Sequence, residues 1–296
     1  MLSDANANLA LARAALLARG PAPAMDEFIP PVLCAGDLHL STGVRLRCIE
    51  QGAPGGRPVV MLHGYTDSGP SFGRLLPLLP SAYRVIVPDQ RGHGDSDRPA
   101  QGYAMRDLAA DVLALMDALD LPRATILGHS MGSFVARTVA LMAPGRVEAL
   151  VLVGGAAGPV NPGMLELREA VLAEGEEISE DFVRGFQESC VRLAVPEPFM
   201  RDVIAASRRA PARVWRDALD GLMTAEPAAG LEALGIPTLL AWGAHDSVFP
   251  PEDRAALRAL LPSAAHLEYG DAGHTPHWEC PDRFAQDLTA FLARVT

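Results

Sequence analysis

Short, continuous runs of apolar residues recur along the chain. They are VVML (59–62), YRVIVP (83–88), ATILG (124–128), VEALVLV (147–153), PTLLAW (237–242) and AHLEY (265–269). A strand that is covered on both faces needs apolar side chains on both, so its sequence is continuously apolar rather than alternating. The six runs predict the strands of a parallel sheet.

Amphipathic helical patterns separate several of these strands. Residues 104–119 carry apolar side chains spaced three and four apart, and 130–142 and 283–292 have similar patterns. Alternating strands and helices predict a doubly wound α/β fold with right-handed crossovers. The segment 37–51, with a turn at Thr42-Gly43, predicts a β-hairpin. The sheet should therefore be mostly parallel and mixed at one edge.

The alternation stops between about residues 156 and 230. Two runs there, MLELREAVLAEG and EDFVRGFQESCVRL, predict helices with no strand between them, and prolines interrupt the segment. We therefore expect a core formed by residues 31–155 and 231–296, with 156–230 inserted as a helical cap.

The first 30 residues are rich in alanine and leucine but do not match an export signal. Asp4 lies in the leading region, and Arg13 and Arg19 interrupt the apolar stretch. Residues 1–30 therefore predict an appended helix, with Met25 as a candidate alternative start. No stretch approaches the ~18 uncharged apolar residues of a membrane span. We expect no membrane span and a cytoplasmic protein.

The charged residues exclude several functions. All 25 basic residues are arginine, and the formal net charge is −11. This negative field repels a phosphate backbone, so we expect no nucleic-acid partner. Without lysine the chain can form neither a Schiff base nor a P-loop.

No motif for a metal or an organic cofactor is present. The cysteines at 34, 48, 190 and 280 lack metal-ligand spacing and are expected to be buried, reduced thiols. The run VGGAAG at 153–158 lacks the spacing of a dinucleotide-binding turn. We therefore predict no cofactor and no metal.

The run TILGHSMGSF places Ser130 between Gly128 and Gly132, directly after a predicted strand. In a sharp turn from strand to helix, side chains at both glycine positions would collide with the backbone. Such a turn holds the serine hydroxyl clear of the sheet at a helix N-terminus, where free N–H groups can stabilise an oxyanion. Ser130 is therefore the candidate nucleophile.

A serine nucleophile needs a histidine base. His274 follows the last predicted strand and precedes the final helix, so the fold returns it to the strand ends where Ser130 lies. His277 is the rival, although it falls where the helix should begin. His39 and His266 lie within strand patterns and are expected to be packed.

The base in turn needs a carboxylate to orient it. Asp246 follows the strand at 237–242, which gives the chain order Ser, Asp, His. Asp271 is expected to form a turn, and Asp253 to lie early in a helix. His245 is expected to be structural, so Asp246 is the predicted acid.

The loop HGYTDSG after the strand at 59–62 predicts the rest of the site. A glycine at position 64 lets the backbone approach Ser130, so the N–H groups of Tyr65 and Met131 are the predicted oxyanion hole. The residues expected to contact substrate are His63, Gly64, Phe134, Phe249 and Trp278. Four cap residues are candidates either to close the site or to pack in the core: Phe182, Phe186, Trp215 and Met223.

Five motifs, HGYTDS, DQRGHGDSDRP, GHSMGS, GAHDSVFP and GHTPHWE, resemble in order and spacing those of the α/β-hydrolase superfamily, in its capped serine esterase-like branch. The resemblance covers about residues 36–155 and 231–296. It implies an eight-stranded sheet, a cap after the sixth strand, and catalysis by Ser130, Asp246 and His274.

Serine at position 130 separates the chain from similar epoxide hydrolases and haloalkane dehalogenases, which use a carboxylate there. A serine points to acyl transfer through an acyl-enzyme. We expect hydrolysis of small-molecule carboxylic esters of small to medium acyl chains, by a monomer or homodimer. The alternatives are C–C bond hydrolysis of dienoic diketones, since GHTPHWE resembles the ending of those hydrolases, lactonase or perhydrolase activity, and a non-enzymatic ligand sensor.

Overall fold

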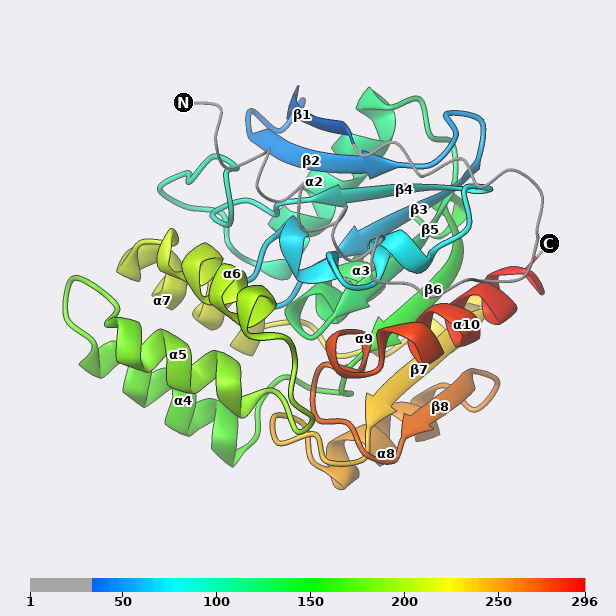
Figure 1. Ribbon diagram of the computed structural model, residues 1–296. Helices are drawn as coiled ribbons and strands as arrows, with labels where there is room; N and C mark the ends of the chain where they lie inside the picture. Colours follow the sequence, from blue (N-terminus) through cyan, green and yellow to red (C-terminus); the bar gives the residue numbers. More distant parts are fainter. Residues whose placement is uncertain (1–33, 296) are drawn as a thin grey trace.

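The computed structural model describes residues 34–295, which are built around one eight-stranded sheet (Figure 1). Its strands are β1 Cys34–His39, β2 Arg45–Gln51, β3 Arg57–Leu62, β4 Tyr83–Pro88, β5 Ala124–His129, β6 Val147–Val153, β7 Thr238–Gly243 and β8 Ala265–Tyr269. Their spatial order is β1-β2-β4-β3-β5-β6-β7-β8. β2 pairs antiparallel with β1 and β4, and the other neighbours pair parallel. The predicted fold class is confirmed.

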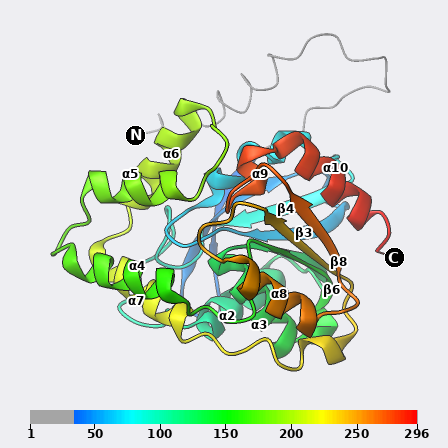
Figure 2. The same ribbon diagram turned by 90° about the horizontal axis from the view of Figure 1, so that it is seen from below.

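Helices cover both faces of the sheet. They are α2 Met105–Ala118, α3 Met131–Met142, α4 Pro162–Ala173, α5 Glu180–Ser189, α6 Glu197–Arg208, α7 Ala212–Met223, α8 Pro251–Leu260, α9 Pro276–Glu279 and α10 Pro281–Leu292. Short 3-10 turns lie at Gly69–Phe72, Leu76–Leu78, Pro144–Arg146 and Leu231–Leu234. One apolar cluster packs α2 and α3 on one face, and a second packs α10 on the other (Figure 2).

The central strands are apolar because no part of them meets water. Every residue of β5 and β7 is buried. The edge strands differ: His39 in β1 and His266 in β8 are exposed. The prediction that these two histidines are packed is wrong, because an edge strand has a neighbour on one side only and its partner helices do not cover it fully.

The helices α4 to α7 follow β6 and precede β7, and they lie to one side of the sheet (Figure 1). The helix predicted in residues 1–30 lies outside the described residues. Within residues 34–295, no helix has the length and apolar character needed to cross a membrane. The thiols of Cys48, Cys190 and Cys280 are unpaired; the first two are buried and Cys280 is partly exposed.

Arg137 of α3 binds both chain segments that link the helices α4 to α7 to the core, one before α4 and one after α7. Its side chain is 2% exposed. Nη1 donates to the carbonyls of Ala156 and Ala157 at 2.8 and 3.0 Å, and Nη2 donates to that of Glu226 at 2.8 Å. Burial lowers the pKa of Arg137 to about 10, so the guanidinium is still charged at neutral pH. Its plane lies over the ring of Phe134, with Cζ 4.1 Å from the ring centroid.

Replacement of Arg137 by methionine should lower the free energy of unfolding by about 2–4 kcal/mol, because the carbonyls that it binds lose their donor. Urea unfolding followed by fluorescence measures this. The matched control is Arg168→Met, which removes a half-exposed ion pair with Asp220 and should cost less than about 1 kcal/mol. Equal stability losses in the two variants would contradict the assignment.

Candidate active site

Close contacts between backbone segments determine which residues can form the turn that carries Ser130. Ser130 lies between β5 and α3 with φ of +50°, in the left-handed region that side chains avoid. A Cβ at Gly128 would lie 2.0 Å from the carbonyl oxygen of Gly132, and a Cβ at Gly132 would lie 2.2 Å from that of Leu62. Only glycine fits at both positions, as the sequence predicted.

His274 lies on the loop after β8 and is hydrogen-bonded to Asp246. Its Nδ1 lies 2.9 Å from Asp246 Oδ2, and both side chains are almost completely buried. The other carboxylate oxygen accepts the N–H groups of Val248 and Phe249 at 2.8 and 3.0 Å. A Cβ at Gly154, whose φ is +56°, would lie 2.9 Å from His274 Cε1. The glycine-rich run after β6 therefore makes room for the imidazole.

Burial raises the pKa of the Asp246 carboxyl. The charge of His274 and the hydrogen bonds to Asp246 lower that pKa by a larger amount, so the net shift is downward. An ionised Asp246 favours the tautomer with the proton on Nδ1. His274 Nε2 is buried and has no hydrogen-bond partner within residues 34–295. It is therefore available to accept a proton from a group in the cavity.

Glu279 holds the loop that carries His274. Its carboxylate accepts the N–H of Gly273 at 2.9 Å and the hydroxyl of Thr275 at 3.1 Å, on either side of the histidine. The same carboxylate accepts the N–H groups of Arg192 and Leu193 at 2.8 and 2.7 Å. One buried acid thus joins the loop to the segment that follows α5.

That segment also contacts His274 directly. The N–H of His274 donates to the carbonyl of Cys190 at 2.9 Å. A Cβ at Gly273 would lie 2.9 Å from the same carbonyl oxygen. The histidine loop is therefore packed backbone to backbone against the end of α5.

The two predicted oxyanion donors lie on different segments: Met131 directly follows Ser130 in the chain, and Tyr65 lines the same cavity as Ser130. Met131 is the first residue of α3, where amide N–H groups have no partner inside the helix. Tyr65 follows β3, and neither its amide nor that of Met131 donates a hydrogen bond to another residue in the described chain. The phenol of Tyr65 donates to the carbonyl of Trp215 in α7 at 2.6 Å. This contact places α7 over the loop after β3.

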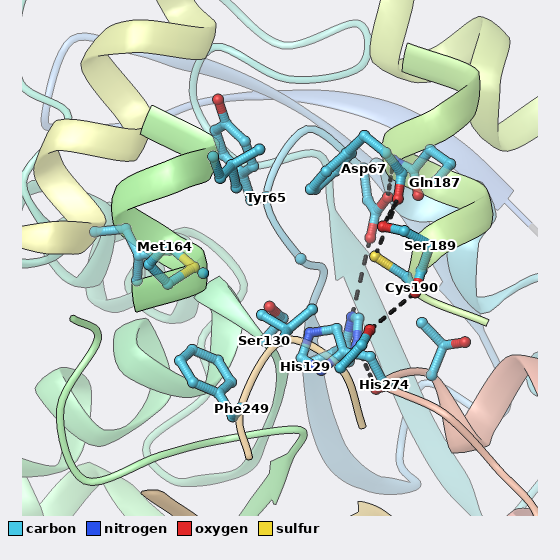
Figure 3. Close-up of a pocket in the computed structure, with 18 of the residues that line it drawn as sticks. Tyr65, Asp67, His129, Ser130, Met164, Gln187, Ser189, Cys190, Phe249 and His274 are labelled. Carbon is cyan, nitrogen blue, oxygen red and sulfur yellow. Dashed lines mark hydrogen bonds and ion pairs between the residues drawn. The ribbon is translucent and has the colours of Figure 1, made fainter. Parts of the chain in front are cut away.

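A cavity of about 270 Å³ opens beside Ser130 and His274 (Figure 3). Its apolar wall is formed by Met164, Leu167, Phe186, Leu222, Val248, Phe249 and Trp278. Its polar lining includes Asp67, His129, Gln187, Ser189, Cys190, Ser247 and Thr275. The cavity therefore lies between the sheet and the helices α4, α5 and α7. No arginine lines it among the described residues.

Comparison with known proteins identifies the family. The family model for the alpha/beta hydrolase fold matches residues 57–281. This chain is an α/β hydrolase. The family predicted from the five motifs is thereby confirmed.

Two curated relatives and one solved structure are similar to this α/β hydrolase. A 2-hydroxymuconate semialdehyde hydrolase from Pseudomonas sp. (strain CF600) is 30% identical, over 86% of this chain and 93% of that protein. A non-heme chloroperoxidase from Streptomyces lividans is 33% identical, over 87% of this chain and 99% of that protein. An esterase from Exiguobacterium antarcticum superposes with a TM-score of 0.78 at 24% identity, over 88% of this chain and all of that one. The last likeness supports the fold.

The residues predicted to contact substrate divide into two groups. Gly64, Phe249 and Trp278 line the cavity, whereas His63 and Phe134 do not. His63 is buried and its Nε2 accepts the N–H of Gln90 at 2.9 Å. Phe134 packs behind Phe249, with ring centroids 5.8 Å apart. Substrate contact by His63 or Phe134 stays a prediction.

The four cap candidates also divide. Phe186 lines the cavity, but Phe182, Trp215 and Met223 do not. Trp215 is fully buried and packs edge-on against Tyr65 and Phe186. It supports the cavity wall from behind.

The rival residues do not line the cavity, although His277 packs behind its wall with its ring centroid 4.5 Å from that of His129. His277 is buried between the rings of Phe72 and Phe284, and His245 is exposed. Asp253 lies in the first turn of α8, as predicted, and accepts a hydrogen bond from Asn161 at 2.9 Å. None of the three lines the cavity.

Sequence reasoning missed Asp67, His129 and Gln187 on the cavity wall. Asp67 lies two residues after Tyr65 on the predicted oxyanion loop, and this position could have indicated that it lines the cavity. His129 directly precedes Ser130 in the chain, and no pattern in the sequence indicates that its side chain lines the cavity. Gln187 belongs to no motif, and no pattern in the sequence pairs it with a residue 120 positions earlier.

Replacement of Glu279 by glutamine should slow covalent labelling of Ser130 by a fluorophosphonate about tenfold or more. The new amide N–H would face backbone N–H groups, and a loosened loop misplaces the base. Labelling rates measured by intact-protein mass spectrometry test this, with a melting curve to confirm folding. The control is Glu252→Gln, an exposed carboxylate in α8. An unchanged rate in a folded Glu279→Gln variant would refute a positioning role.

Proposed function

We propose that this α/β hydrolase cleaves uncharged carboxylic esters of small to medium acyl chains through an acyl-enzyme. One observation carries the proposal: a buried imidazole, hydrogen-bonded to a buried carboxylate, lines the same apolar cavity as a serine held in a strained turn. This is the arrangement of nucleophile, base and orienting acid that acyl transfer requires.

In the first half-reaction, Ser130 Oγ attacks the ester carbonyl while His274 Nε2 takes the hydroxyl proton. Asp246 stays ionised and stabilises the imidazolium through the 2.9 Å hydrogen bond. The N–H groups of Tyr65 and Met131 would stabilise the oxyanion; one such donor is typically worth ~10²–10³ in rate. The bond to the alcohol oxygen then breaks, and the alcohol leaves with the proton from His274.

In the second half-reaction, water attacks the acyl group on Ser130. His274 takes a proton from the water and returns it to the serine oxygen as the acyl bond breaks, which releases a carboxylic acid. The free Nε2 of His274 is suited to both transfers because no other described residue occupies it. The cycle ends with the original serine and neutral imidazole.

The cavity favours uncharged substrates. Its volume of about 270 Å³ is near the lower end of ligand pockets, which typically hold ~300–1,000 Å³. Its walls are mostly apolar, and no arginine among the described residues lines it to neutralise an acid. Burial of an unpaired carboxylate is costly, so an anionic acyl group should bind poorly.

Replacement of Ser130 by alanine should lower kcat/KM for a small chromogenic ester by at least about 10³-fold, since the nucleophile is lost. The matched control is Ser263→Ala, at an exposed position after α8, which should hydrolyse the ester at the wild-type rate. Equal activity of Ser130→Ala and wild type, or no activity in either, would overturn the proposal.

A C–C bond hydrolase is the second candidate, because a 2-hydroxymuconate semialdehyde hydrolase is 30% identical over most of the chain. No arginine within residues 34–295 lines the cavity, which argues against an acidic substrate. In a panel of neutral esters, lactones, a dienoic diketone acid and peracid formation, we expect the neutral ester to give the highest kcat/KM. Faster, Ser130-dependent cleavage of the dienoic acid would favour the second candidate, and a ligand that raises Tm without turnover would favour a sensor.

A further inference from the structure

The cavity has two chemically different sides. In Figure 3, Asp67, Gln187, Ser189 and Cys190 gather on one side, Met164 and Phe249 lie on the other, and Ser130 lies between them. A plain alkyl chain suits the second side. On the first side, such a chain would displace water from the polar groups without offering them a hydrogen bond in return, which is costly.

Asp67 is buried in this wall without an ordinary ionic partner. Its side chain is 4% exposed, and its Oδ2 lies 3.9 Å from His129 Nδ1. Within residues 34–295 it forms no ion pair with an arginine. His129 Nδ1 is itself buried without a hydrogen-bond partner in the described chain. A polar pair of this kind is expensive to bury unless it serves a ligand or holds the fold.

Gln187 fixes the orientation of Asp67. Its amide nitrogen donates to Asp67 Oδ1 at 3.1 Å and to Ser207 Oγ of α6 at 2.9 Å. These two bonds use both N–H groups of the amide. Gln187 therefore orients the Asp67 carboxyl from α5. Because both N–H groups of Gln187 are already used, Asp67 is the residue of this pair that can hydrogen-bond to a ligand.

We propose that Asp67 is a specificity-determining residue, which in its carboxylic acid form donates a hydrogen bond to an uncharged oxygen of the substrate, such as an ether, carbonyl or hydroxyl oxygen. The proposal rests on the proposed ester hydrolysis and narrows its substrate class to esters with a second oxygen function. That oxygen lies on the polar side of the cavity, away from Met164 and Phe249.

The charge of Asp67 depends on the groups that face it. These are His129 from β5, Cys190 at the end of α5, and His274 from the loop after β8. Burial lowers the pKa of His129 well below its usual value and raises that of the Cys190 thiol, so both are neutral near pH 7. Burial raises the pKa of Asp67 to about 7, against the smaller opposing effects of Gln187, His274 and a hydrogen bond with the backbone of Gly64.

The direction of the pH effect follows. Below pH 7 Asp67 holds its proton and can donate a hydrogen bond to an ether oxygen. As the pH rises through about 7, the acid loses this proton and becomes an acceptor that repels the same oxygen. A preference for oxygen-bearing substrates should therefore be greatest near pH 6 and smaller at pH 8.

Paired fluorophosphonate probes test the proposal. Both probes have chains of equal length, one entirely alkyl and the other with one CH₂ replaced by an ether oxygen, which is moved along the chain in a short series. The ratio of the two labelling rates cancels any pH dependence of the labelling reaction that both probes share. At pH 6 we expect the best ether probe to label the wild-type enzyme about tenfold faster than the alkyl probe does, because one hydrogen bond to a buried group can contribute this much.

Three variants complete the test. Asp67→Asn keeps a donor that does not titrate, so it should retain the preference at both pH values. Asp67→Ala should bring the ratio to about one. The control Asp181→Asn, an exposed carboxylate in α5, should behave as wild type. Melting curves confirm that each variant is folded.

The outcomes separate the two proposals. A ratio in Asp67→Ala equal to that of wild type, or a wild-type ratio near one at pH 6 for every probe, overturns the role of Asp67 whatever the enzyme hydrolyses. If the enzyme hydrolyses none of the esters but its ratio of labelling rates still depends on Asp67, the role of Asp67 is supported and only the proposed ester hydrolysis is overturned.

Discussion

The hydrogen bond between Asp246 and His274 is the interaction on which the site depends. It spans 28 residues and joins the ends of two neighbouring strands, β7 and β8. Because Asp246 is anchored by two backbone N–H groups, it can hold the imidazole in one tautomer. Without that anchor the imidazole would lose the fixed tautomer and orientation that the proposed proton transfer from Ser130 requires.

The helices α4 to α7 are part of the site rather than a cover placed over it. Glu279 and the carbonyl of Cys190 join them to the His274 loop, Gln187 joins them to the loop after β3, and Arg137 binds both of their connections. These contacts are mostly buried and polar, so they depend strongly on geometry. The cavity shape is therefore set by the same contacts that position His274.

Much of the fold was predictable from the sequence, because continuous apolar runs leave few alternatives for β3 to β7. The glycines around Ser130 announce a turn that only glycine permits. His39 and His266 were mispredicted because the edge position of a strand is a property of the sheet, which the strand's own residues do not encode. Asp67, Gln187 and Glu279 have roles that arise from contacts between distant segments, so no local pattern reveals them.

Rapid quenching during ester turnover, followed by peptide mass spectrometry, tests the central claim most directly. The account predicts a transient adduct with the mass of the acyl group on the peptide that contains Ser130, formed and lost at rates consistent with kcat. Turnover without an adduct, or an adduct on another residue, would contradict it.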